Sequence, residues 1–112
     1  MDENLQRWQT ELKKGYAKPC VLYVLSKGDY NAYRITKEVR RLTNGQIVIA
    51  GSNIYPMLRG LAKEGLVERF EKEDQKLYKI TLNGREFLEN LLEHFRDFLE
   101  TMLSIVNKEE GV

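Results

Sequence analysis

The residues best suited to chemistry are polar, aromatic and basic side chains between positions 51 and 67. Tyr55, Arg59 and Lys63 recur every four residues, a spacing that places them on one face of a helix. Arginine can pair with guanine, while tyrosine and lysine can contact phosphate. The spacing therefore predicts a helix whose exposed face is of the kind that can enter the major groove of double-stranded DNA.

The candidate base-edge contacts on this helix are Ser52, Asn53 and Arg59, because asparagine can also pair with adenine. The candidate backbone contacts come from this helix, the segment before it and a charged turn after it: Tyr33, Lys37, Tyr55, Lys63, Lys72, Gln75 and Lys76. Two assignments have structural alternatives. Ser52 can act as a helix cap, with or without a base contact, and Tyr33 can equally pack in the core.

The local pattern supports a short amphipathic helix. Ser52 and Asn53 are typical N-cap residues, and Pro56 suits a first turn. Gly65 is expected to end the helix, since glycine adopts the left-handed conformation found there. Apolar residues fall at helical spacing on the other face: Ile54, Leu58, Leu61 and Ala62.

The residues that follow predict a β-hairpin and a long helix. Residues 66–70 and 76–80 have the composition and alternation of strands, and the charged residues 71–75 form the turn. A helical pattern then runs over 85–108. Helix, hairpin and helix in this order indicate a winged helix-turn-helix, in a chain that is mainly α with one small hairpin.

Two phrases in this region resemble the PadR family of transcription regulators. Residues 54–61, Ile-Tyr-Pro-Met-Leu-Arg-Gly-Leu, with the later Glu-Gly-Leu-Val of 64–67, are similar to its recognition-helix signature. Residues 78–84, Tyr-Lys-Ile-Thr-Leu-Asn-Gly, are similar to its wing-to-helix phrase Tyr-x-Ile-Thr-x-x-Gly. An upstream phrase, Gly-x-x-His-Gly-Tyr-x-Ile, is kept only in part over residues 28–35. The resemblance covers roughly residues 15 to 106.

The departures from the family pattern bear on base preference. Asn31 and Ala32 replace His-Gly, and Ser52-Asn53 stands where many members have Gly-Thr. The resemblance implies a homodimeric repressor that binds an inverted-repeat operator. It also implies release of the DNA by a small lipophilic or aromatic effector near the dimer interface.

Charge is distributed unevenly along the 112 residues, although the net charge is only +1. Residues 1–84 hold 15 basic and 10 acidic side chains, a net charge of +5, whereas residues 85–112 hold 3 and 7, a net charge of −4. We therefore expect a winged-helix DNA-binding domain over 1–84, with its own N-terminal helix, and a dimerisation helix over 85–112.

Three more helices are expected before the recognition helix, over 3–14, 19–25 and 33–42. In the third, Ile35, Val39 and Leu42 form the inward stripe. Residues 46–50 are expected to be an extended link or one edge strand. The hairpin carries four acidic and four basic residues between 68 and 79, so we expect it to contribute little to DNA binding.

The last helix carries two heptad rows and a third apolar row beside them. So broad an apolar surface predicts a second copy of the chain as its cover. The predicted interface consists of Leu5, Trp8, Leu12, Leu88, Leu91, Leu92, Phe95, Phe98, Leu99 and Met102. An effector pocket there would be lined by Trp8, Leu12, Leu91, Phe95 and Phe98, the alternative being a dry, packed interface.

No catalytic, cofactor or metal signature is present in the sequence. Cys20, the single cysteine, lies in an apolar run and is expected to be a small buried hydrophobe rather than a redox sensor. His94, the single histidine, lies near Asp97 on an acidic helix, and we expect a solvated side chain rather than a metal ligand. The sequence thus predicts a DNA-binding protein and not an enzyme. A winged helix that binds only proteins is the alternative, which the nearly neutral net charge permits.

No apolar stretch reaches the length of about 20 residues that a membrane-spanning helix needs. The N-terminus lacks the basic and then apolar order of a signal peptide. We therefore expect no membrane partner and a cytoplasmic location, at the prokaryotic nucleoid.

Overall fold

The computed structural model describes residues 2–110 and confirms a mainly helical fold with one hairpin. Its elements follow in the order α1 (Glu3–Lys14), α2 (Ala17–Lys27), α3 (Ala32–Leu42), α4 (Gly51–Lys63), β1 (Val67–Lys72), β2 (Gln75–Ile80) and α5 (Leu82–Glu110). The two strands pair antiparallel, with Val67 opposite Ile80 and Lys72 opposite Gln75. Helix, hairpin and helix therefore form the winged helix-turn-helix that the sequence predicts.

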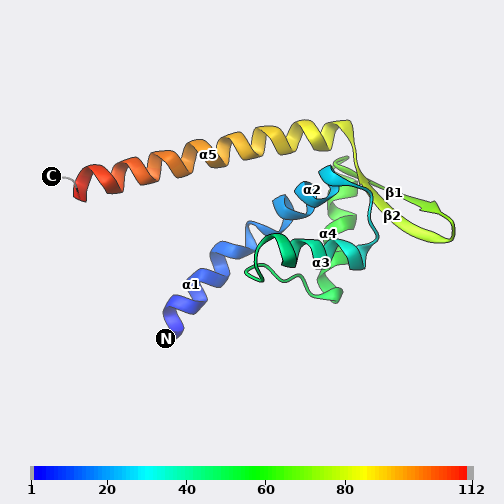
Figure 1. The fold of residues 1–112 in the computed structure, drawn as a ribbon, viewed down its shortest axis with the longest axis horizontal. Coiled ribbons are helices and arrows are strands. Elements are labelled where there is room, and N and C mark those ends of the chain that lie inside the picture. Colours follow the sequence, from blue (N-terminus) through cyan, green and yellow to red (C-terminus); the bar gives the residue numbers. More distant parts are fainter. Residues whose placement is uncertain (1, 111–112) are drawn as a thin grey trace.

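The core lies where α2, α3, α4, the base of the hairpin and the start of α5 meet (Figure 1). Its largest fully buried side chains are aliphatic: Leu22, Leu25, Ile35, Ile54, Leu58, Val21, Val24 and Val39. Because α2 contributes four buried residues and contacts α3, β2 and α5, it is the central helix of the domain.

The base of the hairpin is fixed to the helical body by a short backbone bridge. The Tyr30 amide donates to the Tyr78 carbonyl at 3.2 Å, and the Tyr78 amide donates to the Tyr30 carbonyl at 2.9 Å. Tyr78 is itself buried in the core. The strands therefore leave the body in a direction set by the α2–α3 loop.

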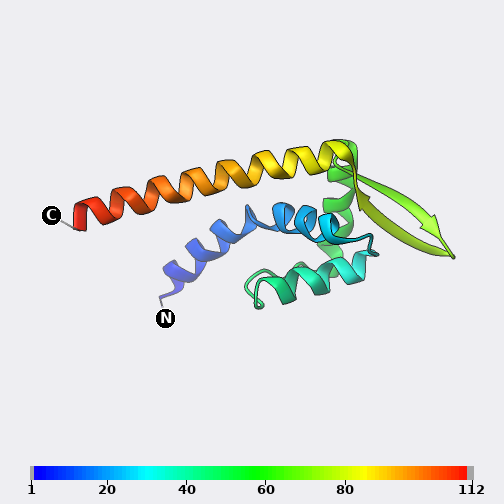
Figure 2. The ribbon, with the colours of Figure 1, turned by 45° about the horizontal axis from the view of Figure 1, so that its top comes forward.

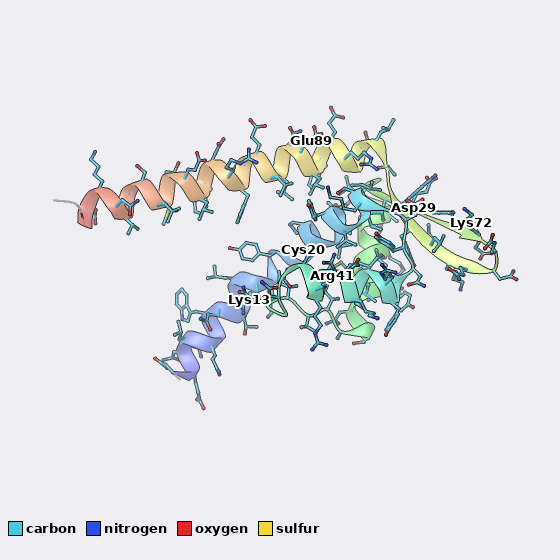
Figure 3. All side chains as sticks on the ribbon, viewed as in Figure 1. Lys13, Cys20, Asp29, Arg41, Lys72 and Glu89 are labelled. Carbon is cyan, nitrogen blue, oxygen red and sulfur yellow. The ribbon has the colours of Figure 1, made fainter. Side chains whose placement is uncertain are left out.

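α1 and the second half of α5 project from the body on the same side (Figures 1 and 2). α1 buries no residue, and large apolar side chains remain exposed on both helices. On α5 these are Leu82, Phe87, Leu92, Phe95, Phe98, Leu99, Met102, Leu103, Ile105 and Val106. Figure 3 shows that side chains along the far part of α5 meet no other element of the protomer.

Several sequence-based expectations need correction. Of the two alternatives for residues 46–50, the edge strand is excluded and the link remains, and Leu42, expected to face inward, is exposed. Ala62 is also exposed, because the buried stripe of α4 is confined to Ile54, Leu58 and Leu61. Leu88, assigned to the dimer interface, is only 5% exposed and packs in the protomer's own core. It is therefore a domain residue rather than an interface residue.

The helix boundaries also differ by a few residues. α2 begins at Ala17 rather than Pro19, which still leaves the proline in the first turn, and extends to Lys27. α5 begins at Leu82 rather than at position 85, because the Thr81 hydroxyl accepts a hydrogen bond from the Gly84 amide at 2.9 Å.

Candidate nucleic-acid interface

α4 presents the predicted polar stripe to solvent. Ile54, Leu58 and Leu61 are buried against α3 and β1, which turns the opposite face outward. On that face Tyr55, Arg59 and Lys63 are all exposed, with Tyr55 51% exposed. The spacing of four residues therefore produces one continuous row of a hydroxyl, a guanidinium and an ammonium group.

The C-terminal end of α4 is closed as the sequence predicts. Gly65 has a φ of +77°, and its amide donates to the Ala62 carbonyl. The Leu66 amide donates to the Leu61 carbonyl at 3.0 Å, which completes a Schellman motif. Leu61 and Leu66 are both buried, so this end of α4 is rigidly attached to the core.

The N-terminal end of α4 differs from the prediction. The helix begins at Gly51 with Ala50 as its cap residue, and no side chain caps it. The Asn53 and Ile54 amides both donate to the Ala50 carbonyl. Ser52 is therefore not the cap, and Ser52 and Asn53 are exposed in the first turn. The helix holds both side chains at the solvent-exposed surface of its first turn, where a DNA partner could reach them.

Pro56 lies inside α4 rather than in its first turn. Proline has no amide hydrogen, so the Ser52 carbonyl, four residues earlier, loses its helical donor. The Ser52 carbonyl is therefore left without the donor that a continuous helix would supply. The sequence shows the proline, but whether Pro56 lies in the first turn or inside α4 depends on the residue at which the helix begins.

A hollow of about 370 Å³ separates α4 from the hairpin. It is lined by Asn31, Ala32, Tyr33, Tyr55, Asp74, Gln75, Lys76 and Tyr78. Four predicted DNA contacts, from α3, α4 and β2, thus surround one concave surface. Phenol hydroxyls and an ammonium group around such a surface can bind a phosphate group.

Tyr33 is 70% exposed, so core packing, the alternative for this residue, is excluded. The ammonium group of Lys37 lies 5.4 Å from the centroid of its ring. This contact holds Lys37 along the outer face of α3 and leaves its charge in solvent.

Ion pairs divide the basic residues of α3 into two groups. Glu38 accepts from Arg41 Nε at 2.7 Å and lies 3.6 Å from Arg34. The hydrogen bond from Arg41 lowers the pKa of the Glu38 carboxyl, and the charge of Arg34 lowers it further. Arg40 takes part in no such pair within residues 2–110. Arg40 is not among the DNA contacts predicted from the sequence, because the pairing of its neighbours is visible only in the structure.

The hairpin presents Lys72, Gln75 and Lys76 as exposed side chains near its tip. Its two-residue turn is formed by Glu73 and Asp74, both with positive φ (Figure 3 labels Lys72 just before it). At the base, Lys79 pairs with Glu68 at 3.6 Å and lies over the Phe70 ring. Unpaired positive charge on the hairpin therefore comes from the tip and from Arg69 of β1, which is exposed and forms no ion pair with the described residues.

The family model for the transcriptional regulator PadR-like family matches residues 21–90, more than half of the chain. The chain belongs to the PadR-like family. The match runs from within α2 to the first part of α5, and so contains all of α3, α4 and the hairpin. A comparison with curated proteins finds no match.

Solved structures share this fold over most of the chain. A PadR-like transcriptional regulator from Bacillus cereus is 26% identical and superposes with a TM-score of 0.76, covering 86% of this chain and 96% of that one. A transcriptional regulator from Clostridium thermocellum is 26% identical, with a TM-score of 0.73 and coverage of 88% and 93%. Bacillus subtilis PadR, solved in complex with operator DNA, is 29% identical with a TM-score of 0.59, covering 67% of this chain and 45% of that one.

This PadR-like chain has a second concave surface, whose lining includes no residue of α4. A groove of about 910 Å³ lies between the end of α1, α2, the end of α3 and α5. Of the predicted effector-pocket residues, Leu12, Leu91, Phe95 and Phe98 line it, whereas Trp8 does not. The Tyr16 ring meets the Phe95 ring edge to face at 5.7 Å between centroids. The groove thus has largely apolar and aromatic walls.

Cys20 and His94 also border this groove. Cys20 is half-buried rather than fully buried, and burial raises the pKa of its thiol, which lowers the thiolate population at neutral pH. His94 is exposed.

Within residues 2–110, no group of three His, Cys, Asp or Glu side chains is placed to hold a metal ion. Over the same residues, no helix combines the length and apolarity needed to cross a membrane. Members of the PadR-like family are transcriptional regulators rather than enzymes, and the chain shares that class.

Proposed function

We propose that this PadR-like regulator is a sequence-specific repressor that binds double-stranded DNA as a homodimer, with one α4 in each half-site of an inverted repeat. The observation that carries the proposal is the exposed row on α4. Tyr55, Arg59 and Lys63 face solvent on a helix whose other face and C-terminal end are fixed in the core. A rigid helix with base-reading and phosphate-binding groups fits a major groove.

The two projecting helices support the homodimer. α1 exposes Leu5, Trp8 and Leu12, and α5 exposes an apolar surface over several turns. Exposed apolar surface of this extent on helices without a partner element usually marks an interface. The proposed interface comprises Leu5, Trp8, Leu12, Leu91, Leu92, Phe95, Phe98, Leu99 and Met102, with Leu88 removed for the reason given above. A two-fold dimer would present two α4 helices to DNA, which is why an inverted repeat is the expected operator.

The test of the DNA face compares two alanine substitutions on a duplex that the wild-type protein selects from a random pool. Arg59→Ala should weaken specific binding by about 1–3 kcal/mol and relax the preference at one base pair. Lys76→Ala should weaken binding slightly and equally on all sequences. If neither variant changes binding, α4 does not contact the bases. If the wild type selects no duplex at any salt concentration, a protein-interaction module is the better description.

We further propose that a small lipophilic or aromatic effector binds in the groove and releases the DNA. The groove is bordered by the end of α3 and by Gln46 and Ile47, which lead into α4. The Thr43 hydroxyl holds this connection by accepting from the Ile47 amide at 3.0 Å. A ligand that displaces the connection would therefore move the recognition helix.

The effector proposal is tested with a panel of planar aromatic compounds added to the preformed DNA complex. Release should be lost in Tyr23→Ala, because Tyr23 lines the groove but lies outside the proposed dimer interface, while DNA affinity without ligand is kept. Uniform failure of the panel to release DNA from the wild type would favour a packed interface instead. Repression is tested by a promoter reporter, whose expression should fall when the chain is produced.

A further inference from the structure

The outer surface of α3 is divided into two parallel rows. Tyr33, Lys37 and Arg40 are spaced by four and three residues and are all exposed, so they form one row, which we call the α3 stripe. Arg34, Glu38 and Arg41 have the same spacing and form the neighbouring row. Both rows carry two positive charges, but only the second also carries a negative one.

The charges of the two rows differ in availability. Glu38 forms ion pairs with both Arg34 and Arg41, and like any glutamate whose pKa is not raised it is ionised at neutral pH. In the α3 stripe, no carboxylate of residues 2–110 forms an ion pair with Lys37 or Arg40. An anionic partner therefore meets two uncompensated charges on the stripe, but a net charge of only +1 on the row beside it, where Glu38 pairs with both arginines.

The α3 stripe begins at the hollow between α4 and the hairpin. Tyr33, its first member, lines that hollow together with Tyr55 and Lys76. From Tyr33 to Arg40 the stripe extends about 10 Å along the helix. That length exceeds the axial spacing of phosphates along one DNA strand, about 3.4 Å, so more than one phosphate can be contacted.

We infer that the α3 stripe binds the backbone of a single DNA strand, which leaves the hollow beside Tyr55 and passes Lys37 and Arg40. This rests on the proposed DNA-binding function and extends its footprint beyond the base-contacting turn of α4. Arg40 is the new phosphate contact. Arg34 and Arg41, which pair with Glu38, do not contact the phosphates in this arrangement. The partner is duplex DNA outside the base-read positions, recognised through phosphate charge and not through sequence.

The neighbouring residues Arg40 and Arg41 provide a matched pair, since they have the same charge and lie in the same turn. The dissociation constant is measured against salt concentration for Arg40→Ala and Arg41→Ala, on a duplex selected by the wild-type protein. Each lost phosphate contact flattens the log–log slope by about 0.9. Arg40→Ala should show that loss, Arg40→Lys should restore the slope, and Arg41→Ala should stay near the wild type. Circular dichroism and thermal unfolding confirm that each variant is folded.

A second measurement locates the contact. Single phosphates of the duplex are replaced by uncharged methylphosphonates, and the replacement that weakens the wild type but not Arg40→Ala identifies the phosphate bound by Arg40. It should lie on the same strand as the phosphate identified in this way with Lys37→Ala.

Equal slopes for Arg40→Ala and Arg41→Ala, or contacts on two different strands, would overturn the inference. In that case Arg59→Ala would still weaken binding, and the proposed function would stand. If the wild type shows no salt-dependent binding, the proposed function fails, and the inference fails with it.

Discussion

Thr81 and Gly84 join three elements at one point. The Thr81 amide donates to the Leu66 carbonyl at 3.0 Å, and its hydroxyl donates to the Gly65 carbonyl at 2.6 Å. The same hydroxyl oxygen accepts from the Gly84 amide in the first turn of α5. The end of α4, the end of the hairpin and the start of α5 are thereby held together. This explains physically why a threonine and a glycine occur in the wing-to-helix phrase.

Gly84→Ala should destabilise the fold, because a Cβ at this position would overlap the Leu66 carbonyl oxygen and lie 2.6 Å from Ile80 Cγ1. Overpacking of this kind costs about 1–3 kcal/mol. Gly60→Ala is the control, since a Cβ there meets nothing within 4 Å and a helical alanine should stabilise α4 by about 0.5–1 kcal/mol. Urea unfolding of both variants measures the difference. Equal midpoints would show that the Gly84 contact can relax at no cost.

At the scale of residues, the sequence predicts well which side chains share one face of a helix, because the helical period alone decides this. Tyr55, Arg59 and Lys63 share a face because helical spacing requires it, and the structure exposes all three. Arg40 and Arg41 could not be told apart in this way. Both are basic and both are exposed, and only the position of Glu38 shows which one is neutralised.

At the scale of elements, the hairpin turn is the least favourable local structure in the interface. Glu73 and Asp74 have φ values of +52° and +65°, as in a type I′ turn, where Asn-Gly is the preferred pair. Neither residue has the conformational freedom of glycine. Their two negative charges also lie at the tip that would approach DNA.

Asp74→Gly should therefore stabilise the hairpin by about 0.5–1 kcal/mol. The substitution removes the cost of holding an aspartate in the left-handed conformation, but glycine also makes the unfolded chain more flexible, which offsets part of that gain. Thermal unfolding without DNA measures this effect. Gln75→Gly, one residue further and inside β2, is the control and should be destabilising. Asp74→Gly should also tighten DNA binding, because Asp74 lines the same hollow as Lys76. A lower melting temperature for Asp74→Gly would mean that the aspartate makes a compensating contact.

The start of α4 shows why element boundaries were harder to predict than element types. Ser52 and Asn53 have the composition of caps, yet Ala50 occupies the cap position. Ile49 and Ile54 are both buried, and their placement in the core fixes where the chain turns into the helix. Tertiary packing therefore outweighs capping preference here, since a cap contributes only about 1 kcal/mol.

At the scale of the whole molecule, the protomer is extended, measuring 61 × 33 × 22 Å. Much of that length comes from α5 and α1 (Figure 1), which expose apolar side chains. The heptad rows of α5 predicted such a surface from the sequence. They did not predict that the first row begins inside the domain at Leu88, because a periodic pattern does not show where the body ends and the projecting part begins.

Phe98→Glu should convert the proposed dimer into a folded monomer, because Phe98 is exposed in the protomer and a carboxylate cannot be buried unpaired in an apolar interface. Sedimentation at micromolar concentration measures the mass. Leu82→Glu is the control, since Leu82 is an 86% exposed leucine on the same helix but outside the proposed interface. The monomer should bind the selected duplex at least tenfold more weakly, because the two half-sites are no longer linked.

The fluorescence of Trp8 provides an independent readout of dimer formation. It is the only tryptophan, it is 68% exposed in the protomer, and the proposed interface would cover it. Its emission should therefore lie at shorter wavelength in the dimer and move to longer wavelength on dilution, with a midpoint at the dimer dissociation constant. Phe98→Glu should show the longer wavelength at every concentration, whereas Leu82→Glu should follow the wild type. Emission that does not change with dilution while sedimentation shows dissociation would place α1 outside the interface and leave α5 as its sole helix.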